Sequence, residues 1–268
     1  MSKFKFMQKA EDKPKVLDLY IYDDIEGGTN FNYAAMEFEE SKTSAEYFRK
    51  QLNQYTDLEE INLYINTCGG DVFEGMAIRN QLKRNKAKVN AIVDGIAASA
   101  GSFVLTGCDN VKMYSNTMQM VHNMWTYTCG NSQELRKTAD DMDKMMEGNR
   151  QAYLEKSKGK LSEEKLKELL NNETWLTAQE CLEYGLCDEI IEEEADMTEA
   201  FNMIKGLNQS IQGQIKFNQA LRSMYKQSIK TVEPKQQEPL EEEEHKEEQQ
   251  QKENNFTLLQ KMFKKEGM

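Results

Sequence analysis

The chain has 268 residues, of which 46 are Asp or Glu and 34 are Lys or Arg, giving a formal net charge of -12. This balance disfavours binding to nucleic acid or to anionic membranes, because both need a basic surface. No apolar run approaches the roughly 20 residues that span a bilayer, and the first residues lack the apolar stretch of a secretory signal. We therefore expect a cytoplasmic protein that binds neither partner.

Strand and helix patterns alternate through the first part of the chain, judged by β-branched runs, helical spacing and glycine punctuation. In chain order they predict a flexible N-terminus (1–15), a strand (16–22), a loop (23–32), a helix (44–55), a strand (61–65), a helix (73–84), a strand (89–93) and a helix (97–105). Strands that alternate with helices indicate an α/β domain of repeated βαβ units.

The second part begins with short strands next to Met113 and over 118–122. Its longest helix is predicted at 131–157, with Asn131 as N-cap and Glu134 completing a capping box. Shorter helices are expected at 162–170 and 177–184. We assign the domain to residues 16–192.

The composition changes after this domain. Residues 193–225 keep scattered apolar side chains, which favours a helical extension, whereas residues 226–268 form an acidic tail rich in Glu, Gln and Lys. Such a tail cannot offset the entropy of ordering, so we expect it to be disordered. A short terminal helix near 255–265 is an alternative for its end.

The five cysteines include no Cys-x-x-Cys pair. An odd, scattered set favours reduced thiols over a disulfide framework. The predicted domain contains one histidine, and the cysteines lack ligand spacing, so we expect no metal site.

A serine among small residues follows the strand predicted at 89–93, in the segment DGIAASAGS. At a strand-to-helix turn, Ser99 would face backbone N–H groups and the positive end of a helix. Simple helix packing explains the same residues. The segment alone does not decide between the two.

His122 is the histidine available to a folded site, because His245 lies in the acidic tail. A serine hydroxyl needs a base to take its proton, and imidazole suits that task near neutral pH. A buried structural histidine is the alternative interpretation.

The segment INTCGGDV places two glycines, Gly69 and Gly70, after a predicted strand. Glycines permit backbone geometry that turns an N–H toward an oxyanion. An ordinary turn explains them equally well, and no Gly-Lys-Ser/Thr follows to indicate a phosphate loop.

Together, INTCGGDV, DGIAASAGS, MQMVH and ETWLTAQECLEYGLCDE resemble the ClpP serine peptidase family, most closely its bacteriophage branch of prohead (head maturation) proteases. The resemblance covers about residues 16–191, with the motifs in family order. It implies a ClpP/crotonase-like fold that carries an acidic, partly helical and partly disordered C-terminal extension.

The resemblance implies Ser99 as nucleophile and His122 as general base. It implies Glu173 as third member, although the family usually has Asp there, with Asp188 as the fallback. The N–H groups of Gly70 and Ala100 would form the oxyanion hole.

Further positions follow from the same resemblance. Gly69, Val72 and Trp125 would contact the substrate backbone. Thr67-Cys68 stands where the family commonly has Ser-Pro, which predicts a looser turn with the donor intact. Cys68 is a poor candidate nucleophile because no base lies near it in sequence.

The implied activity is that of a serine endopeptidase that needs no cofactor and assembles into a ring-like homo-oligomer. Capsid or scaffold segments would be its substrates, in a host cytoplasm or inside the prohead. Two alternatives remain at this point: a crotonase-type enzyme that holds an acyl-CoA oxyanion, and a non-catalytic scaffold or assembly protein.

Overall fold

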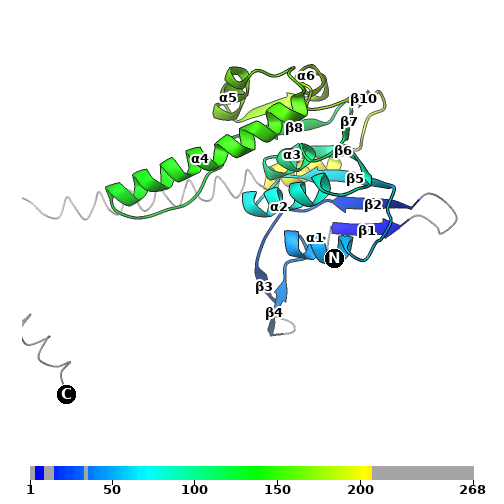
Figure 1. Ribbon diagram of the computed structural model, residues 1–268, viewed down its shortest axis with the longest axis horizontal. Coiled ribbons are helices and arrows are strands. Elements are labelled where there is room, and N and C mark those ends of the chain that lie inside the picture. The colour runs from blue at the N-terminus through cyan, green and yellow to red at the C-terminus, as the bar shows by residue number, and fades with distance from the viewer. Residues whose placement is uncertain (1–3, 9–14, 33–35, 207–268) are drawn as a thin grey trace, which may run out of the picture. The chain divides into compact units, whose positions relative to one another are not determined.

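The computed structural model describes residues 4–8, 15–32 and 36–206, all within one unit of the chain, residues 1–211. Its centre is an eight-stranded sheet (Figure 1). The main path of the sheet runs β1 (Phe4–Gln8), β2 (Val16–Ile21), β5 (Glu60–Thr67), β6 (Lys88–Ala98), β7 (Asn110–Tyr114) and β10 (Glu189–Ile191). β1 pairs antiparallel with β2, and the other pairs on this path are parallel. The α/β class predicted from the sequence is confirmed.

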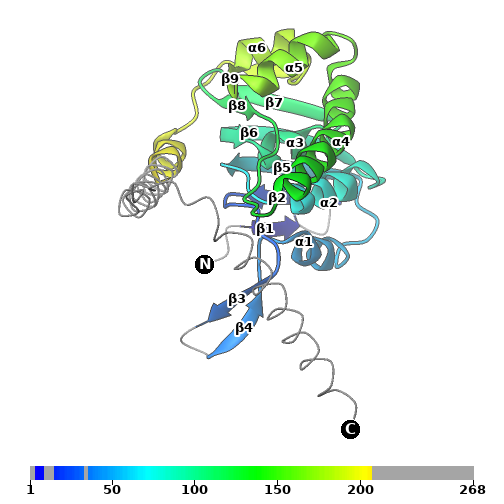
Figure 2. The ribbon, with the colours of Figure 1, turned by 90° about the vertical axis from the view of Figure 1, so that its left-hand side faces the viewer.

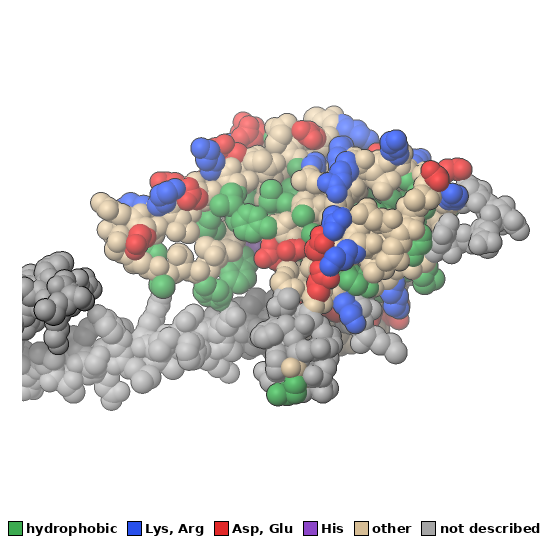
Figure 3. All heavy atoms as spheres, turned by 60° about the horizontal axis from the view of Figure 1, so that its bottom comes forward, with side chains coloured by type: hydrophobic (Ala, Val, Ile, Leu, Met, Phe, Trp, Pro, Cys, Tyr) green, Lys and Arg blue, Asp and Glu red, His purple; other side chains and the backbone are tan. Residues whose placement is uncertain are grey.

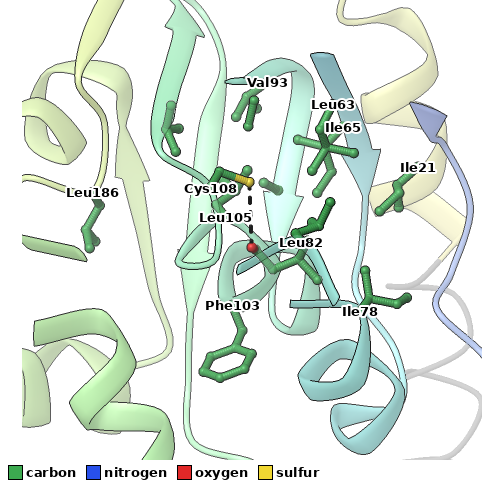
Figure 4. Close-up of a cluster of buried hydrophobic side chains, with 14 of the residues drawn as sticks. Ile21, Leu63, Ile65, Ile78, Leu82, Val93, Phe103, Leu105, Cys108 and Leu186 are labelled. Carbon is green, nitrogen blue, oxygen red and sulfur yellow. Dashed lines mark hydrogen bonds between the residues drawn. The ribbon is translucent and has the colours of Figure 1, made fainter. Parts of the chain in front are cut away.

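One part of the core lies between a face of the sheet and three helices, α1 (Ala45–Leu52), α2 (Val72–Lys83) and α3 (Ala100–Leu105) (Figure 2). Burial alternates along β5, so Ile61, Leu63 and Ile65 point into this core. Figure 4 shows Leu63 and Ile65 near Ile78 and Leu82 of α2. The alternation thus fixes which face of each strand meets the helices.

Strand β6 is long enough to pair with two neighbours in succession. Its first part, Asn90–Val93, pairs with β7, and its last part, Ile96–Ala98, pairs in parallel with β8 (Met118–Val121). β9 (Thr174–Thr177) then pairs antiparallel with β8. The carboxyl ends of β6 and β8 therefore lie side by side.

Several elements differ from the sequence prediction. Residues 4–8, predicted to be flexible, form β1, because their alternating phenylalanines give the edge of the sheet another partner strand. The loop predicted at 23–32 ends in the first strand of a hairpin, β3 (Thr29–Asn32) with β4 (Glu37–Glu40). The helix predicted from residue 97 starts at Ala100, because β6 continues to Ala98 as partner of β8.

The longest helix, α4 (Ser132–Ser157), begins with the predicted capping box of Asn131 and Glu134. Its buried residues all lie in its second half, from Met146 onward. In the first half Leu135 is 42% exposed, and the projecting end leaves apolar side chains on the surface (Figure 3). Two shorter helices follow, α5 (Glu163–Asn171) and α6 (Ala178–Glu183).

Beyond β10 the chain returns to the sheet. The Asn116 side chain exchanges two hydrogen bonds with the backbone of Ala195, and a helix starts at Thr198. Ala200 of this helix is fully buried, and its Cβ lies next to Gly95 of β6. The rest of the predicted extension, from residue 207, lies outside the described residues, as do the acidic tail and His245. None of the described helices has the length and apolar character needed to cross a membrane.

Candidate active site

Ser99 lies at the junction between β6 and α3. Its backbone has φ 54° and ψ -122°, in a region that non-glycine residues rarely adopt. Its N–H donates to the Met120 carbonyl at 2.9 Å, which extends the β6–β8 pairing by one step. Strain of this kind persists only where the surroundings impose it, and it is typical of functional turns.

The imidazole of His122 reaches the Ser99 hydroxyl. His122 directly follows β8, and Nε2 lies 2.7 Å from Ser99 Oγ. Both residues are partly buried. Parallel pairing of β6 with β8 brings these strand ends together from positions 23 residues apart in the chain.

The pKa of His122 is lowered from its ordinary value of 6.5, because burial penalises the charged imidazolium. The Glu173 carboxylate opposes this shift through its charge. The ring is thus neutral at pH 7 and has a lone pair for the serine proton.

Glu173 lies near the imidazole without holding it. It is solvent-exposed and has φ 49°, a left-handed conformation unusual for glutamate. Across the residues that the structure describes, no hydrogen bond joins Glu173 to His122. Glu173 therefore acts on His122 by charge, whereas a third member that fixes the ring would need direct contact.

Asp188, the fallback for the third position, belongs to a different cluster. Its carboxylate lies 2.7 Å from the ammonium of the buried Lys156, and it accepts a hydrogen bond from the Val111 N–H. Burial alone would raise the pKa of Asp188, but these hydrogen bonds outweigh it and the pKa is lowered. The structure therefore removes Asp188 as a candidate partner of His122.

Residues Thr67–Asp71, which we call the glycine turn, lie against Ser99. A side-chain Cβ at Gly69 would fall 2.7 Å from Ser99 Cβ and 2.9 Å from the Ala100 nitrogen. Such contacts are impossible, so the turn comes this close to the nucleophile only because Gly69 has no side chain. The di-glycine pattern is thus explained by close approach.

The N–H of Gly70 points away from Ile25, the residue with which Gly70 forms a backbone bridge. Gly70 forms a parallel bridge with Ile25, in which the Ile25 N–H donates to Gly69 O and the Asp71 N–H donates to Ile25 O, both at 2.7 Å. In such a bridge the central residue's own N–H points to the opposite side. Gly70 is exposed, so this N–H is available to a ligand.

Ala100 supplies a second N–H at the start of α3. The first N–H groups of a helix lack internal partners and carry the positive end of its dipole. A Cβ built on Gly69 would lie 2.7 Å from Ser99 Cβ and 2.9 Å from the Ala100 nitrogen, so the residue that precedes Gly70 lies against the start of α3. The predicted oxyanion donors, the N–H groups of Gly70 and Ala100, thus belong to two segments that meet beside Ser99.

The structure separates the predicted substrate contacts into two kinds. Val72 is partly buried at the start of α2, and Trp125 is 64% exposed beyond His122. Gly69 is buried, and both its main-chain groups are engaged, the N–H with Thr67 Oγ1 and the carbonyl with Ile25. Gly69 is thus a structural part of the turn, while Val72 and Trp125 stay accessible.

Cys68 is a weak candidate nucleophile on electrostatic grounds also. Burial, together with the charge of Asp24, raises the pKa of the Cys68 thiol to about 11. The reactive thiolate is therefore scarce near pH 7.

The remaining cysteines and acidic side chains indicate no further site. All five cysteines are free thiols, and no three His, Cys, Asp or Glu side chains of the described residues converge as metal ligands.

Two features near Ser99 were not predicted, the hydrogen bonds of the Ser102 hydroxyl and a backbone bridge. Ser102 Oγ donates to the Ser99 carbonyl at 2.8 Å and lies 2.8 Å from the hydroxyl of the buried Tyr153 on α4. The bridge between Ile25 and Gly70 is the other. Nothing in the sequence indicates that the Tyr153 hydroxyl contacts that of Ser102, 51 residues away in the chain.

This α/β protein thus has a serine, Ser99, in a strained backbone conformation, and its hydroxyl contacts the imidazole of His122, whose pKa is lowered. The N–H groups of Gly70 and Ala100 belong to the neighbouring glycine turn and helix α3. Residues 39–194 match the Clp protease family. The chain belongs to the Clp protease family, whose members are serine peptidases.

Individual relatives agree with this assignment. ATP-dependent Clp protease proteolytic subunits from two Streptococcus pneumoniae strains, Hungary19A-6 and CGSP14, are each 33% identical over 151 residues, which cover 52% of this chain and 72% of theirs. A variant of ClpP1 from Listeria monocytogenes has a similar structure, with a TM-score of 0.51 and 26% sequence identity, covering 66% of this chain and 91% of that one.

Proposed function

We propose that the chain is a serine endopeptidase in which Ser99 attacks the peptide carbonyl and His122 is the general base. The observation that carries this proposal is the 2.7 Å contact between Ser99 Oγ and His122 Nε2. A crotonase-type enzyme has no need of this contact.

The reaction divides into acylation and hydrolysis. Ser99 Oγ bonds to the carbonyl carbon while His122 takes the hydroxyl proton, and the resulting oxyanion accepts hydrogen bonds from the Gly70 and Ala100 N–H groups. His122 then gives the proton to the leaving amine, and the peptide C–N bond breaks. Water, deprotonated by His122, releases the acyl group and restores Ser99.

A fluorophosphonate probe tests this proposal on the full chain. Wild type should be labelled at Ser99, and Ser99→Ala should lose both labelling and cleavage of an unfolded protein substrate such as casein. Ser115→Ala, at an exposed serine away from the site, is the matched control and should behave as wild type. Equal labelling of Ser99→Ala and wild type would refute the proposal.

Assembly into a ring-like homo-oligomer is the second part of the proposal. Clp proteases form such rings, and α4 supports the same behaviour here. Leu135 in the first half of α4 and Met145 at the start of the second half are exposed although both are large and apolar, and exposed apolar side chains favour burial against another copy.

For substrates, we propose flexible capsid or scaffold segments that are cleaved during prohead maturation. Support comes from the resemblance of the four sequence motifs to the bacteriophage branch and from the acidic C-terminal residues beyond the peptidase core. Co-expression with a capsid protein, followed by mass spectrometry of both proteins, tests this. Cleavage that depends on Ser99 supports it, and an intact capsid protein beside active enzyme contradicts it.

A further inference from the structure

Two consecutive glycines with positive φ carry the proposed oxyanion donor. Gly69 has φ 98° and Gly70 has φ 137°, and glycine is the residue that loses most conformational freedom when it is fixed. Cys68 before them contributes no ring that would restrict the backbone. The direction of the Gly70 N–H must therefore depend on the hydrogen bonds that hold the two glycines in place.

Thr67 makes the side-chain hydrogen bonds of this kind. Its Oγ1 donates to the Asp23 carbonyl at 2.7 Å and accepts from the Gly69 N–H at 3.0 Å. The residue is fully buried. One hydroxyl thus uses its donor and one acceptor position, and it ties the glycine turn to the segment that follows β2.

Thr67 also contacts the strand and the helix on either side of Ser99. It pairs with Ala97 on β6, and its Cγ2 would lie 2.5 Å from a Cβ placed at Gly101 of α3. The methyl group therefore packs against the first turn of the nucleophile's helix. A shift of Thr67 would move the turn relative to Ser99.

The Ile25 backbone completes the restraint from the same segment. The Ile25 N–H donates to Gly69 O, and the Ile25 carbonyl accepts from the Asp71 N–H, both at 2.7 Å. The segment 23–25 therefore binds the turn on both sides of Gly70. These are backbone contacts that any residue at position 25 except proline can make. Of the hydrogen bonds between the turn and the segment 23–25, the one from the Thr67 hydroxyl depends on side-chain identity.

We infer that Thr67 is a positioning residue, whose hydroxyl orients the Gly70 N–H toward the oxyanion. This inference rests on the proposed serine peptidase function. Thr67 touches no reacting atom and acts through Gly69 and Gly70. Its removal should therefore lower the rate of the chemical step and leave substrate binding nearly unchanged.

Thr67→Val is the informative substitution because valine has the shape of threonine. It places a methyl group about 3 Å from the Asp23 carbonyl and the Gly69 nitrogen, closer than carbon normally packs, so the turn must move. Loss of an oxyanion donor costs about 100- to 1,000-fold. Displacement of one by a fraction of an ångström should lower kcat by about 10- to 100-fold.

Thr106→Val is the matched control at the other end of the same helix. Thr106 is also buried, and its hydroxyl also makes two hydrogen bonds, donating to the Phe103 carbonyl and accepting from Arg79. Thr67→Ser is the rescue variant, because it keeps the hydroxyl and loses only the methyl group.

The experiment measures kcat and KM for a fluorogenic peptide amide with wild type and the three variants, together with thermal midpoints and fluorophosphonate labelling. We expect Thr67→Val to lower kcat with KM within about twofold of wild type, Thr67→Ser to recover most of the loss, and Thr106→Val to keep wild-type kcat. If Thr67→Val does not fold, Thr67→Cys, a thiol of similar size, is judged by the same criteria.

Two results would overturn the inference. One is a wild-type kcat for Thr67→Val, and the other is an equal loss in Thr67→Val and Thr67→Ser that follows their thermal midpoints. Failure of the peptidase function itself is distinguishable, because wild type would then neither label with the probe nor cleave the peptide.

Discussion

The carboxylate of Glu173 raises the pKa of His122 by charge alone, since no hydrogen bond joins the two side chains. Burial acts in the opposite direction and is the larger effect, so the pKa of His122 stays below its ordinary value of 6.5. In a proposed triad this leaves the third member as an electrostatic partner of the base.

Replacement of Glu173 should therefore change the pH dependence more than the maximal rate. A serine–histidine pair needs neutral imidazole, so the fluorophosphonate labelling rate should rise with pH through the His122 pKa. Glu173→Gln removes a negative charge that favours imidazolium, which lowers this pKa and moves the acid limb to lower pH. The alkaline plateau should fall by less than about tenfold, because the ring loses no hydrogen bond.

Labelling rates measured between about pH 4 and pH 8 test this. Glu173→Asp keeps the charge and is the control, with an acid limb close to that of wild type. A collapse of the plateau by several orders of magnitude in Glu173→Gln would instead show that Glu173 holds the ring directly.

A methyl group at Gly69 should disable the site. The added Cβ would lie 2.6 Å from the Ala98 carbonyl and 2.7 Å from Ser99 Cβ, at a backbone φ of 98°. Gly69→Ala should therefore reduce labelling by about 100-fold or more and destabilise the fold by about 1–3 kcal/mol.

Gly148→Ala is the matched control. A Cβ there meets nothing within 4 Å, and alanine favours helix, so α4 should gain about 0.5–1 kcal/mol with labelling unchanged. Labelling and chemical denaturation of both variants give the comparison. Wild-type labelling of Gly69→Ala would contradict the close approach of turn and nucleophile.

The ion pair of Lys156 with Asp188 should contribute to stability and not to catalysis. Asp188→Asn leaves the buried Lys156 ammonium without its charge partner, which should cost about 1–2 kcal/mol of unfolding free energy, less than for a fully buried pair because the Asp188 side chain is partly exposed. Labelling of the folded variant should match wild type, because Asp188 does not contact His122.

The pH dependence of this effect has a definite sign. The folded-state pKa of Asp188 lies below its ordinary value of 3.8, so its stabilisation is present above that pH and is lost as pH falls through the lower value. The stability gap between wild type and Asp188→Asn should close below about pH 4. The exposed pair of Lys137 and Asp141 is the control, and Asp141→Asn should leave the midpoint unchanged. A similar loss in both variants would contradict the role of burial.

The sequence predicted most helices and the central strands because their patterns are local. The capping box at Asn131 and Glu134 and the alternation of β5 determine these elements within a few residues. Strand β1 and the true end of β6 could not be predicted in this way. The alternation of Phe4 and Phe6 is too short to predict a strand without its partner β2, and the end of β6 depends on its pairing with β8.

The same distinction applies to the site. Ser99 and His122 were identified by residue type and motif, and the contact between them follows from pairing of β6 with β8. Asp188 has the right chemistry for the third position of the triad, but its carboxylate pairs with Lys156. The hydroxyls of Thr67 and Tyr153 escaped notice because a buried polar side chain is recognised by its partners, which lie 44 and 51 residues away.

Disruption of the exposed face of α4 should separate the subunits. Leu135 and Met145 are 42% and 37% exposed, and both precede Met146, where the buried part of α4 begins. We expect these side chains to be buried in a contact between subunits. The double variant Leu135→Glu with Met145→Glu should weaken that contact, because an unpaired carboxylate is costly to bury. Light scattering at micromolar concentration should then report a smaller species than wild type.

Lys137→Glu is the control for this double variant. Lys137 also precedes Met146 and forms only a surface pair with Asp141, so its charge change should leave the assembly intact. The folded state of each variant can be checked by its thermal midpoint, which should change little because neither Leu135 nor Met145 is buried in the chain. An unaltered mass for Leu135→Glu with Met145→Glu would contradict a subunit contact at Leu135 and Met145.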